Sequence, residues 1–310
     1  MSLGSLSSRA IIGTFYEVLE VTAADSWVNP LSMLFESNQE SETYKWLGMS
    51  PVLREWIGGR LAKGLRDNGV TIANKKFEAT LEIPVDWMRR DKTGQILIRI
   101  NEMAKRANNH WAQLLSTLIL NGASQLCYDG QYYFDTDHNE GDSGNQSNSI
   151  TYDAVSTTAP TAAEMQSAIL TAVQQMYGLL DDQGQPMNED ATDFTVMIPV
   201  GFLQSAGAAL GTTVLGNTSN LIQAVGSLGG FGVKLAVNPR LTSWTNKFAV
   251  FRDDGLISPF IRQEEYGVKV DAIAEGSELE FKEDVHQYGI KAMRNVGYGY
   301  WQKACLVTLT

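Results

Sequence analysis

Residues that could hold metals or form disulfides are scarce in this chain. Its 310 residues include two cysteines, Cys127 and Cys305, which lie far apart, and three histidines. Two distant cysteines exclude a disulfide framework and a paired-cysteine metal motif. None of the histidines (His110, His138 and His286) belongs to an HExxH or HxxxH pair, which excludes the ligand sets of zinc hydrolases. We expect no cofactor and no metal centre.

Long apolar runs and positive charge are also scarce. No run of about 18 apolar residues occurs, so we expect no membrane-spanning helix. The first ten residues lack the apolar core of a signal peptide. Lysine and arginine number 24 against 35 aspartates and glutamates, which gives a formal net charge of −11. Because nucleic-acid binding depends on neutralising phosphates, this balance argues against a dedicated nucleic-acid-binding chain. We expect an acidic, soluble, intracellular protein of two average domains or one large one.

Basic residues are concentrated in one segment. From Lys45 to Arg106 the sequence has thirteen basic and seven acidic residues, a balance of +6, whereas the rest of the chain has a balance of −17. A basic segment in an acidic protein can face a polyanion, a second copy of the same chain, or solvent alone. Residues 77–84 alternate apolar and polar side chains, as a half-exposed strand does. The sequence therefore predicts that residues 45–90 form a long two-stranded extension, which needs a surface to lie on.

The rest of the pattern predicts one long helix and an α/β subdomain. Residues 93–121 carry apolar side chains at steps of three and four, and Gly122 follows as a natural stop. Residues 155–252 alternate helical and strand patterns, which is typical of a compact α/β unit. From Leu256 onward the pattern is strand-like. The local signals are a capping box at Thr161 and Glu164 and strand patterns at 194–199, 233–237, 247–251, 267–273, 288–294 and 304–309.

Candidate motifs for chemistry fall short of their templates. The acidic stretch 135–142 begins like a calcium-binding loop, but its glycine comes one residue late and position twelve is a glutamine. A solvated acidic loop within residues 129–149 is the favoured interpretation, and cation binding there stays open. Residues 141–144 share Gly-Asp-Ser-Gly with trypsin-like proteases, but that chemistry needs a general-base histidine and His110 lies in a predicted helix. The glycine-rich segment 226–232 does not match a P-loop. We expect no enzymatic activity.

The order of these parts resembles the Hong Kong 97 capsid fold of tailed phages and encapsulins. The sequence is similar to the Mu-like phage major head subunit family in residues 44–60, 133–138 and 297–304, and the resemblance extends over essentially the whole chain. It implies an α+β fold with an N-terminal arm, an extended β-hairpin loop, a long spine helix, a peripheral domain and an axial domain. The implied ranges are 1–44 for the arm, 45–90 for the extended loop, 91–154 and 253–310 for the peripheral domain with its spine helix at 93–121, and 155–252 for the axial domain.

The resemblance also implies a function. The chain would be a major capsid protein that self-assembles into hexamers and pentamers of an icosahedral tailed-phage head enclosing double-stranded DNA. It would assemble in the bacterial host cytoplasm, reside in the virion, enclose DNA without binding it specifically, and contact no membrane. Because the chain has no long helical N-terminal extension, a separate scaffold or protease is implied, together with a portal. Decoration proteins are left open.

The resemblance places contacts between subunits in the extended loop. We expect four basic residues to meet acidic groups of an adjacent subunit, and one tryptophan to pack beneath the loop. These residues are Arg54, Arg60, Lys63, Arg66 and Trp56. Some relatives form a covalent Lys–Asn bond in this region, which here contains Lys63, Lys75 and Lys76, but no partner asparagine is marked and we expect no crosslink. Two alternatives remain: an enzyme using residues 155–252, and a polyanion-binding protein using residues 45–106.

Overall fold

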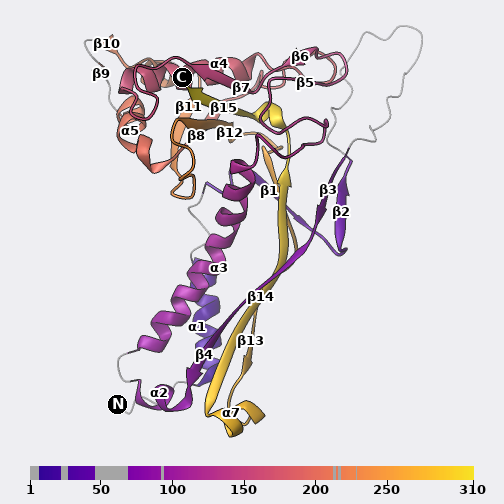
Figure 1. Cartoon of the computed structure of the whole chain (residues 1–310), viewed down its shortest axis with the longest axis vertical. Helices are drawn as coiled ribbons and strands as arrows, with labels where there is room; N and C mark the ends of the chain where they lie inside the picture. Colours follow the sequence, from indigo (N-terminus) through magenta and orange to yellow (C-terminus); the bar gives the residue numbers. More distant parts are fainter. Residues whose placement is uncertain are drawn as a thin grey trace, which may run out of the picture.

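The molecule consists of an elongated stem and an α/β module at one end of it. A computed structural model describes residues 7–21, 27–45, 69–91, 94–211, 214–215, 218–227 and 229–310. Figure 1 shows the stem as long strands flanked by helices, with the α/β module lying across its upper end. Within these described residues, no helix combines the length and the apolar character needed to cross a bilayer.

The stem is built on a four-stranded sheet with the order β1-β13-β14-β4. Its strands are β1 (Ser32–Glu36), β4 (Lys75–Pro84), β13 (Phe260–Ile273) and β14 (Val285–Tyr298). β13 and β14 have 14 residues each, which corresponds to about 46 Å of extended chain. These two strands pair antiparallel, β4 pairs antiparallel with β14, and β1 runs parallel to the first residues of β13. The long pair therefore forms the centre of the stem.

Two helices pack along this sheet. α3 (Gln95–Leu120) has 26 residues, which is about 39 Å of helix, and α1 (Ser8–Val21) runs beside it (Figure 1). The apolar face of α3 packs with Ile11 and Phe15 of α1 and with Tyr288 of β14. Just beyond α3, a Cβ on Gly122 would lie 2.5 Å from the ring of Phe134, so this position needs a glycine. The buried residues of α3 that form this face are Ile96, Ile100, Ala104 and Ala107.

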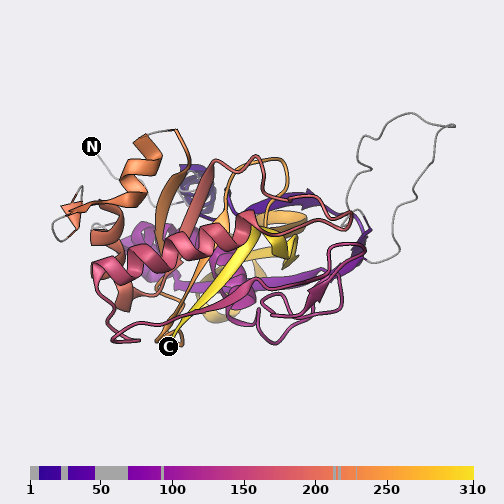
Figure 2. The same cartoon turned by 90° about the horizontal axis from the view of Figure 1, so that it is seen from above.

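The α/β module contains a five-stranded sheet with the order β11-β8-β12-β15-β7. Its elements are β7 (Ser149–Tyr152), α4 (Ala162–Tyr177), β8 (Asp193–Ile198), η1 (Val200–Phe202), α5 (Leu203–Gly211), α6 (Leu221–Ser227), β11 (Gly232–Val237), β12 (Lys247–Arg252) and β15 (Ala304–Leu309). α4 packs against the yellow strand β15, which it crosses in Figure 2. α4 begins at a capping box in which the Glu164 backbone N–H donates to Thr161 Oγ1 and the Thr161 N–H donates to the Glu164 carboxylate. Apolar side chains of the helices and of β8, β12 and β15 form one core.

Shorter elements complete the fold. β2 (Ser41–Tyr44) pairs antiparallel with β3 (Val70–Ala73). α2 (Val85–Arg90) follows β4, and α7 (Glu278–Glu283) joins β13 to β14 at the far end of the stem (Figure 1). The remaining elements are β5 (His138–Asn139), β6 (Asn145–Gln146), β9 (Val214–Leu215), β10 (Thr218–Ser219) and η2 (Trp301–Lys303).

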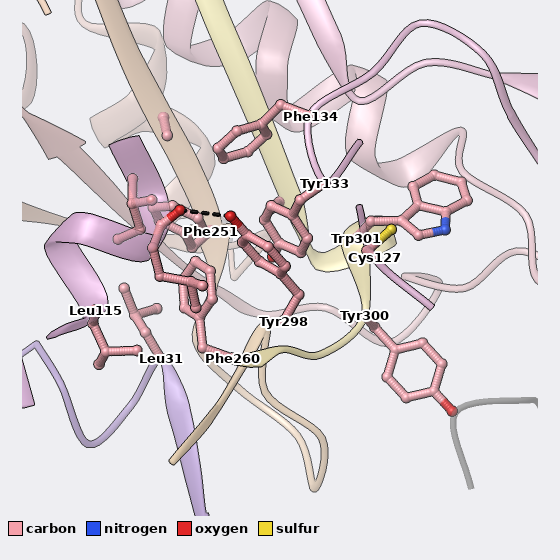
Figure 3. Close-up of a cluster of buried hydrophobic side chains, with 14 of the residues drawn as sticks. Leu31, Leu115, Cys127, Tyr133, Phe134, Phe251, Phe260, Tyr298, Tyr300 and Trp301 are labelled. Carbon is pink, nitrogen blue, oxygen red and sulfur yellow. Dashed lines mark hydrogen bonds between the residues drawn. The ribbon is translucent and has the colours of Figure 1, made fainter. Parts of the chain in front are cut away.

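An aromatic cluster joins the stem to the α/β module (Figure 3). Tyr133 stacks on Tyr298 with ring centroids 4.5 Å apart, and Phe260 lies 5.4 Å from Tyr133. Phe251 of β12 lies 5.3 Å from Phe260, so rings from both sheets touch. The Tyr298 hydroxyl donates a 2.7 Å hydrogen bond to the carbonyl oxygen of Leu118. One continuous core therefore runs from α3 into the α/β module.

Most predicted elements are present. The helix predicted over residues 93–121 spans residues 95–120, and the predicted capping box forms the N-terminal cap of α4. Each predicted strand pattern from 194–199 to 304–309 coincides with a strand of the structure. The helix could be predicted from its periodicity, and β8, β12 and β15 could be predicted from short apolar runs, since these strands are buried on both faces.

Two predictions about which strands lie together are corrected by the structure. The strand predicted over residues 77–84 is present, but it pairs with β14 in the stem rather than within the extension. The strand predicted at 304–309 pairs with β12 and β7, so it belongs to the sheet of the α/β module rather than to that of the stem. An alternating pattern shows which face of a strand is buried, but it does not show which strand lies beside it.

The prediction of a solvated acidic loop at residues 135–142, within an exposed segment 129–149, is only partly right: Asp137, Asn139 and Asp142 are exposed, but other residues of the segment are buried. Tyr133, His138 and Asn148 are fully buried within it. The side-chain amide of Asn148 donates to the carbonyl oxygens of Tyr133 at 2.8 Å and Trp301 at 3.1 Å. Polar side chains of the segment are paired with each other and with backbone groups, and this pairing offsets the cost of burying them.

Candidate assembly surfaces

The residues predicted to contact a neighbouring subunit all lie within residues 46–68, outside the described residues. They are Arg54, Trp56, Arg60, Lys63 and Arg66. The structure does describe both ends of this segment. The chain reaches residue 45 through β2 and resumes at residue 69 before β3, and the pairing of Tyr44 with Val70 places the two ends next to each other. The β2–β3 pair is therefore the base from which the basic segment leaves and to which it returns.

This base is fixed to the stem by Gln263 of β13. The fully buried Gln263 side chain accepts a 2.7 Å hydrogen bond from the Tyr44 hydroxyl. Its amide nitrogen donates to the carbonyl oxygen of Ile72 at 3.0 Å and to Oδ1 of Asn74 at 2.9 Å. Burial and the nearby Glu42 raise the pKa of Tyr44 to about 12, so the phenol stays protonated and remains a donor. No sequence motif marks Gln263, and its role was not predicted.

Close packing at one glycine supports the same base. Ile72 of β3 lies over Gly297 of β14, where an added Cβ would be 2.4 Å from the Ile72 Cδ1 atom. Any larger residue at position 297 would displace the Ile72 side chain from its place between β3 and β14. Gly297 thus provides the space in which the Ile72 and Val70 side chains of β3 lie against β14.

Two arginines are buried beneath this surface with one carboxylate between them. Arg262 and Arg294 lie over the ring of Trp111, at 5.5 and 4.7 Å from its centroid. The Nη1 atom of Arg294 lies 3.8 Å from Oε1 of Glu264. Burial lowers the pKa of both arginines and raises that of Glu264. The Nε atoms of both arginines have no hydrogen-bond partner. The cluster therefore leaves a positive charge incompletely compensated inside the stem.

A furrow runs along the stem between α3 and the edge strand β4. Two hollows of about 420 and 500 Å³ share Leu81 and Arg99 and so form one depression, which we call the stem furrow. Its floor is apolar, and charged side chains lie along its rim. The floor includes Phe77, Ala79, Leu81, Ile83, Ile96, Met103 and Ala107, and the rim includes Glu78, Glu82, Arg90, Arg99, Glu102, Arg106, Lys291 and Arg294.

His110 lies at the upper end of the stem furrow. Its ring packs edge-on against Phe77 at 4.4 Å between centroids. Burial, together with the nearby Arg294 and Arg240, lowers the pKa of His110 to about 4. The imidazole is therefore neutral at neutral pH and acts as part of the packed wall.

One group of side chains in the described residues has the donor types of a metal site. Ligand-type atoms of Cys127, Asp129 and His138 lie within 4.8 Å of one another. They already pair: the Asp129 carboxylate accepts from the Cys127 thiol at 2.9 Å and contacts His138 Nδ1 at 2.6 Å. Burial alone would raise the pKa of Asp129, but these hydrogen bonds outweigh it and lower the pKa. Burial also raises the pKa of the Cys127 thiol, so it stays protonated. The group behaves as a hydrogen-bonded structural unit.

A second carboxylate is buried beside this unit. Glu140 accepts hydrogen bonds of 2.9 Å from the Tyr128 hydroxyl and from the Gln302 amide. Burial raises the pKa of Glu140 to about 7 in spite of these hydrogen bonds. His138 stacks on Trp301 with ring centroids 3.9 Å apart. These contacts tie the 129–149 segment to η2, and the composition of the segment did not reveal them.

Several large apolar side chains face solvent on separate elements. Phe281 of α7 is 91% exposed, Leu256 is 98% exposed, and Trp87 of α2 is 67% exposed. Such side chains are common one at a time. An aromatic ring left outside on a helix is more informative, because aromatic residues are enriched in contacts between proteins. Phe281 stands among acidic residues in the sequence Glu-Leu-Glu-Phe-Lys-Glu, a signal that the sequence analysis did not use.

A family model and curated relatives agree with this architecture. The model described as Mu-like prophage major head subunit gpT matches residues 9–161 and 235–309. The chain belongs to this family. The major head subunit of the Haemophilus influenzae FluMu prophage is 30% identical over 236 residues, which cover 70% of this chain and 77% of that protein. The major capsid protein of Escherichia phage Mu is 38% identical over 115 residues, 37% of this chain and 38% of the Mu protein.

Solved structures agree on the fold of this head subunit. A chain of the bacteriophage JBD30 procapsid has a TM-score of 0.53 and 22% identity, over 97% of this chain and 75% of that one. The JBD30 capsid decorated with minor capsid protein trimers has a TM-score of 0.51 and 16% identity, over 93% of this chain and 65% of that one. The mixed α+β fold thus matches Hong Kong 97-like capsid structures. The protein is a major capsid protein of the tailed-phage type, a structural component of the virion rather than an enzyme.

Proposed function

We propose that this head subunit self-assembles into the hexamers and pentamers of an icosahedral tailed-phage head that encloses double-stranded DNA. The supporting observation is the β2–β3 base. It holds both ends of a basic segment against the stem of an acidic protein, through a buried and fully hydrogen-bonded Gln263. A segment presented in this way can reach a second copy while its base stays fixed. The chain's formal charge of −11 also suits a container to whose wall the packaged DNA must not adhere.

The parts of the chain take the following roles in this proposal. Residues 1–44 form an N-terminal arm, residues 45–90 the extended loop, residues 91–154 and 253–310 the peripheral domain with its spine helix, and residues 155–252 the axial domain. The stem corresponds to the peripheral domain together with α1 and β1 of the arm and β4 of the extended-loop range, and the α/β module corresponds to the axial domain. Since β7 and β15 pair within the module sheet, these two strands act with residues 155–252 in the axial domain.

The extended loop carries the contacts between subunits. Arg54, Arg60, Lys63 and Arg66 meet acidic groups of the adjacent copy, and Trp56 packs apolar surface beneath the loop. Each exposed ion pair contributes only about 0–1 kcal/mol. Repetition of the contact around every capsomer makes the shell stable in spite of this small increment. A separate scaffold or protease, a portal and decoration proteins complete the partners, and the DNA is enclosed without specific recognition.

Charge reversal in the extended loop tests this proposal. Arg54→Glu combined with Arg60→Glu is expected to abolish shells while the thermal unfolding temperature stays within a few degrees of the wild type. The matched control is Arg240→Glu combined with Lys269→Glu, which reverses two exposed basic residues on other elements. Electron microscopy of both variants, co-expressed with the phage's scaffold, gives the readout. Normal shells from the first variant would contradict the assigned contact.

A further inference from the structure

The outer edge of the stem sheet is a long, open strand. β4 is the last strand in the order of this sheet, and its 10 residues correspond to about 33 Å of extended chain (Figure 1). β14 covers one edge of β4, whereas no backbone hydrogen bond crosses its other edge among the residues that the structure describes. Proteins usually cover an open edge of this length, because its unpaired N–H and C=O groups can pair with a strand of another chain. β4 is therefore a candidate contact between subunits.

The side chains of β4 alternate between an apolar face and a polar face. The apolar face forms part of the floor of the stem furrow, and the polar face is exposed. Because residues opposite each other on antiparallel strands project to the same face, a partner strand has to carry the same alternation. A second copy of β4 does so. The apolar positions are Phe77, Ala79, Leu81 and Ile83, and the polar positions are Lys76, Glu78, Thr80 and Glu82.

The charges of β4 favour one antiparallel register between two copies of this strand. When Ala79 of one copy lies opposite Ala79 of the other, Lys76 of each strand faces Glu82 of its partner. A shift by two residues in one direction places Glu78 opposite Glu82, and the opposite shift places Glu78 opposite Glu78. Both neighbouring registers that keep the two faces matched therefore bring like charges together, which is unfavourable. The strand is complementary to itself in the register centred on Ala79.

The two charged residues of this register are available for a contact with another subunit. Among the residues that the structure describes, neither Lys76 nor Glu82 forms an ion pair, and both are exposed. Glu82 accepts a 2.8 Å hydrogen bond from the Gln287 amide, which leaves its charge uncompensated. The ion pairs beside the furrow join other residues, Arg99 with Glu102 and Lys291 with Asp271. A pair formed between copies thus replaces no ion pair within the subunit.

We propose that the β4 edges of two head subunits pair antiparallel about a two-fold axis at Ala79, which joins the two stem sheets into one. Backbone hydrogen bonds form along the paired edges, and Lys76 of each copy faces Glu82 of the other. Phe77 of each copy lies opposite Leu81 of its partner on the apolar face, so the contact covers part of both furrow floors. This inference rests on the proposed function, because it adds a contact between copies of the same shell subunit.

The symmetry of the contact places it between capsomers. The same strand supplies both sides, so the contact is isologous and lies on a two-fold axis. Hexamers and pentamers are closed by heterologous contacts, in which two different surfaces of the subunit meet. The β4 pair therefore joins subunits of two different capsomers, whereas the basic segment joins neighbours within one. A single strand pair is a small contact, and its repetition over the shell makes it effective.

Disulfide trapping in assembled particles tests the proposal directly. Opposite residues of antiparallel strands have Cα atoms about 4.5–5.5 Å apart, which a disulfide can span. Full-length Ala79→Cys, co-expressed with the scaffold and oxidised with copper phenanthroline, is expected to give disulfide-linked dimers on a non-reducing gel. Lys75→Cys is the matched control: it is equally exposed on β4, but its two copies would lie about 27 Å apart. The native Cys127 and Cys305 are buried. Shells in which Ala79→Cys gives no more dimer than Lys75→Cys would overturn the proposal.

A charge swap in the same Ala79→Cys chain gives a second readout. Lys76→Glu or Glu82→Lys alone places like charges opposite each other, and each is expected to lower the yield of crosslinked dimer about three- to tenfold. Lys76→Glu combined with Glu82→Lys restores opposite charges across the two-fold axis and should recover the dimer. A double variant as poor as the single ones would overturn the register.

The crosslinking result separates this contact from the proposed function. Normal shells of Ala79→Cys without crosslinked dimers would overturn the β4 pair and leave the proposed function standing. Failure of the wild type itself to form shells with its scaffold would overturn both.

Discussion

The Tyr44 hydroxyl donates a 2.7 Å hydrogen bond to Oε1 of Gln263, and this contact joins β2 to β13. The Gln263 amide continues the connection to Ile72 and Asn74, on and next to β3. A single buried side chain thus fixes both strands that bound the basic segment. A buried amide whose donors and acceptor are all satisfied sets one geometry, because any displacement leaves a polar group unpaired at a cost of about 1–3 kcal/mol.

Replacing this amide should therefore damage both folding and assembly. Gln263→Leu leaves the Tyr44 hydroxyl and the Asn74 side chain without their partner, and we expect the free energy of unfolding to fall by about 2–4 kcal/mol. Urea denaturation measures this change, and electron microscopy should show few or no closed shells. Gln287→Leu is the matched control, since Gln287 of β14 is only partly buried and pairs with Glu82. Equal effects of the two substitutions would show that Gln263 has no special role.

Packing at Gly297 gives a steric prediction. Gly297→Ala places a methyl group 2.4 Å from Ile72 Cδ1, and we expect a loss of about 1–3 kcal/mol in unfolding free energy. Removing the clashing carbon with Ile72→Val in the same chain should restore part of that loss. Gly201→Ala is the control, because no atom lies within 4 Å of an added Cβ there. The wild type, Gly297→Ala, Ile72→Val and the double variant form a double-mutant cycle, which denaturation measures. Strict additivity of their unfolding free energies would contradict the contact between β3 and β14.

The raised pKa of Glu140 predicts that the stability of the folded protein depends on pH. Its pKa of about 7 in the folded protein lies above the usual 4.5, so the folded state binds the proton more tightly than the unfolded state does. The contribution of Glu140 to stability is therefore greatest below pH 4.5, declines as the pH rises towards 7, and is a constant penalty above that. Glu140→Gln keeps an acceptor for the Tyr128 hydroxyl without the charge. We expect this variant to exceed the wild type at pH 8 by at most about 3 kcal/mol, and by much less at pH 5.

Thermal unfolding across this pH range checks the prediction. The control is Glu283→Gln, which neutralises an exposed carboxylate on α7. A stability difference between Glu140→Gln and the wild type that grows on acidification would contradict the assignment of Glu140 as a buried, unfavourably charged group.

The paired state of Cys127, Asp129 and His138 leads to a prediction about metals. Since the Cys127 thiol and Nδ1 of His138 are both already paired with the Asp129 carboxylate, neither excess EDTA nor added Zn²⁺ should change the unfolding temperature. Differential scanning calorimetry with both additives makes the measurement. A rise in unfolding temperature with Zn²⁺ that Cys127→Ser abolishes and Cys305→Ser preserves would show that the group binds metal.

Local features of the fold could be predicted from the sequence because they depend on neighbours a few residues apart. The apolar steps of α3 and the Thr161–Glu164 capping box both act within one or two helical turns. The partner of β4 could not be predicted, since the alternation of residues 77–84 is the same beside β14 as beside a strand of the extension. Residues 129–149 look solvated by composition. Their burial depends on pairings such as Asp129 with His138 and Asn148 with Trp301, which composition cannot reveal.

The candidate surfaces, too, could be predicted only where they depend on local sequence. The positive charge of residues 45–106 could be counted in the sequence. The attachment of the β2–β3 base to the stem could not be predicted, because it depends on Gln263, which is distant in sequence and belongs to no motif. The stem furrow exists because α3 and β4 lie side by side, a relationship set by tertiary pairing. Phe281 is a single aromatic residue among acids, and its exposure follows from the caps on α7.

Electron microscopy of the purified chain, alone and co-expressed with its phage's scaffold, tests the central claim most directly. The account predicts closed icosahedral shells, or discrete hexamers and pentamers, with light scattering that shows the same assembled species in solution. A monodisperse monomer under both conditions would contradict self-assembly through the segment that the β2–β3 base holds.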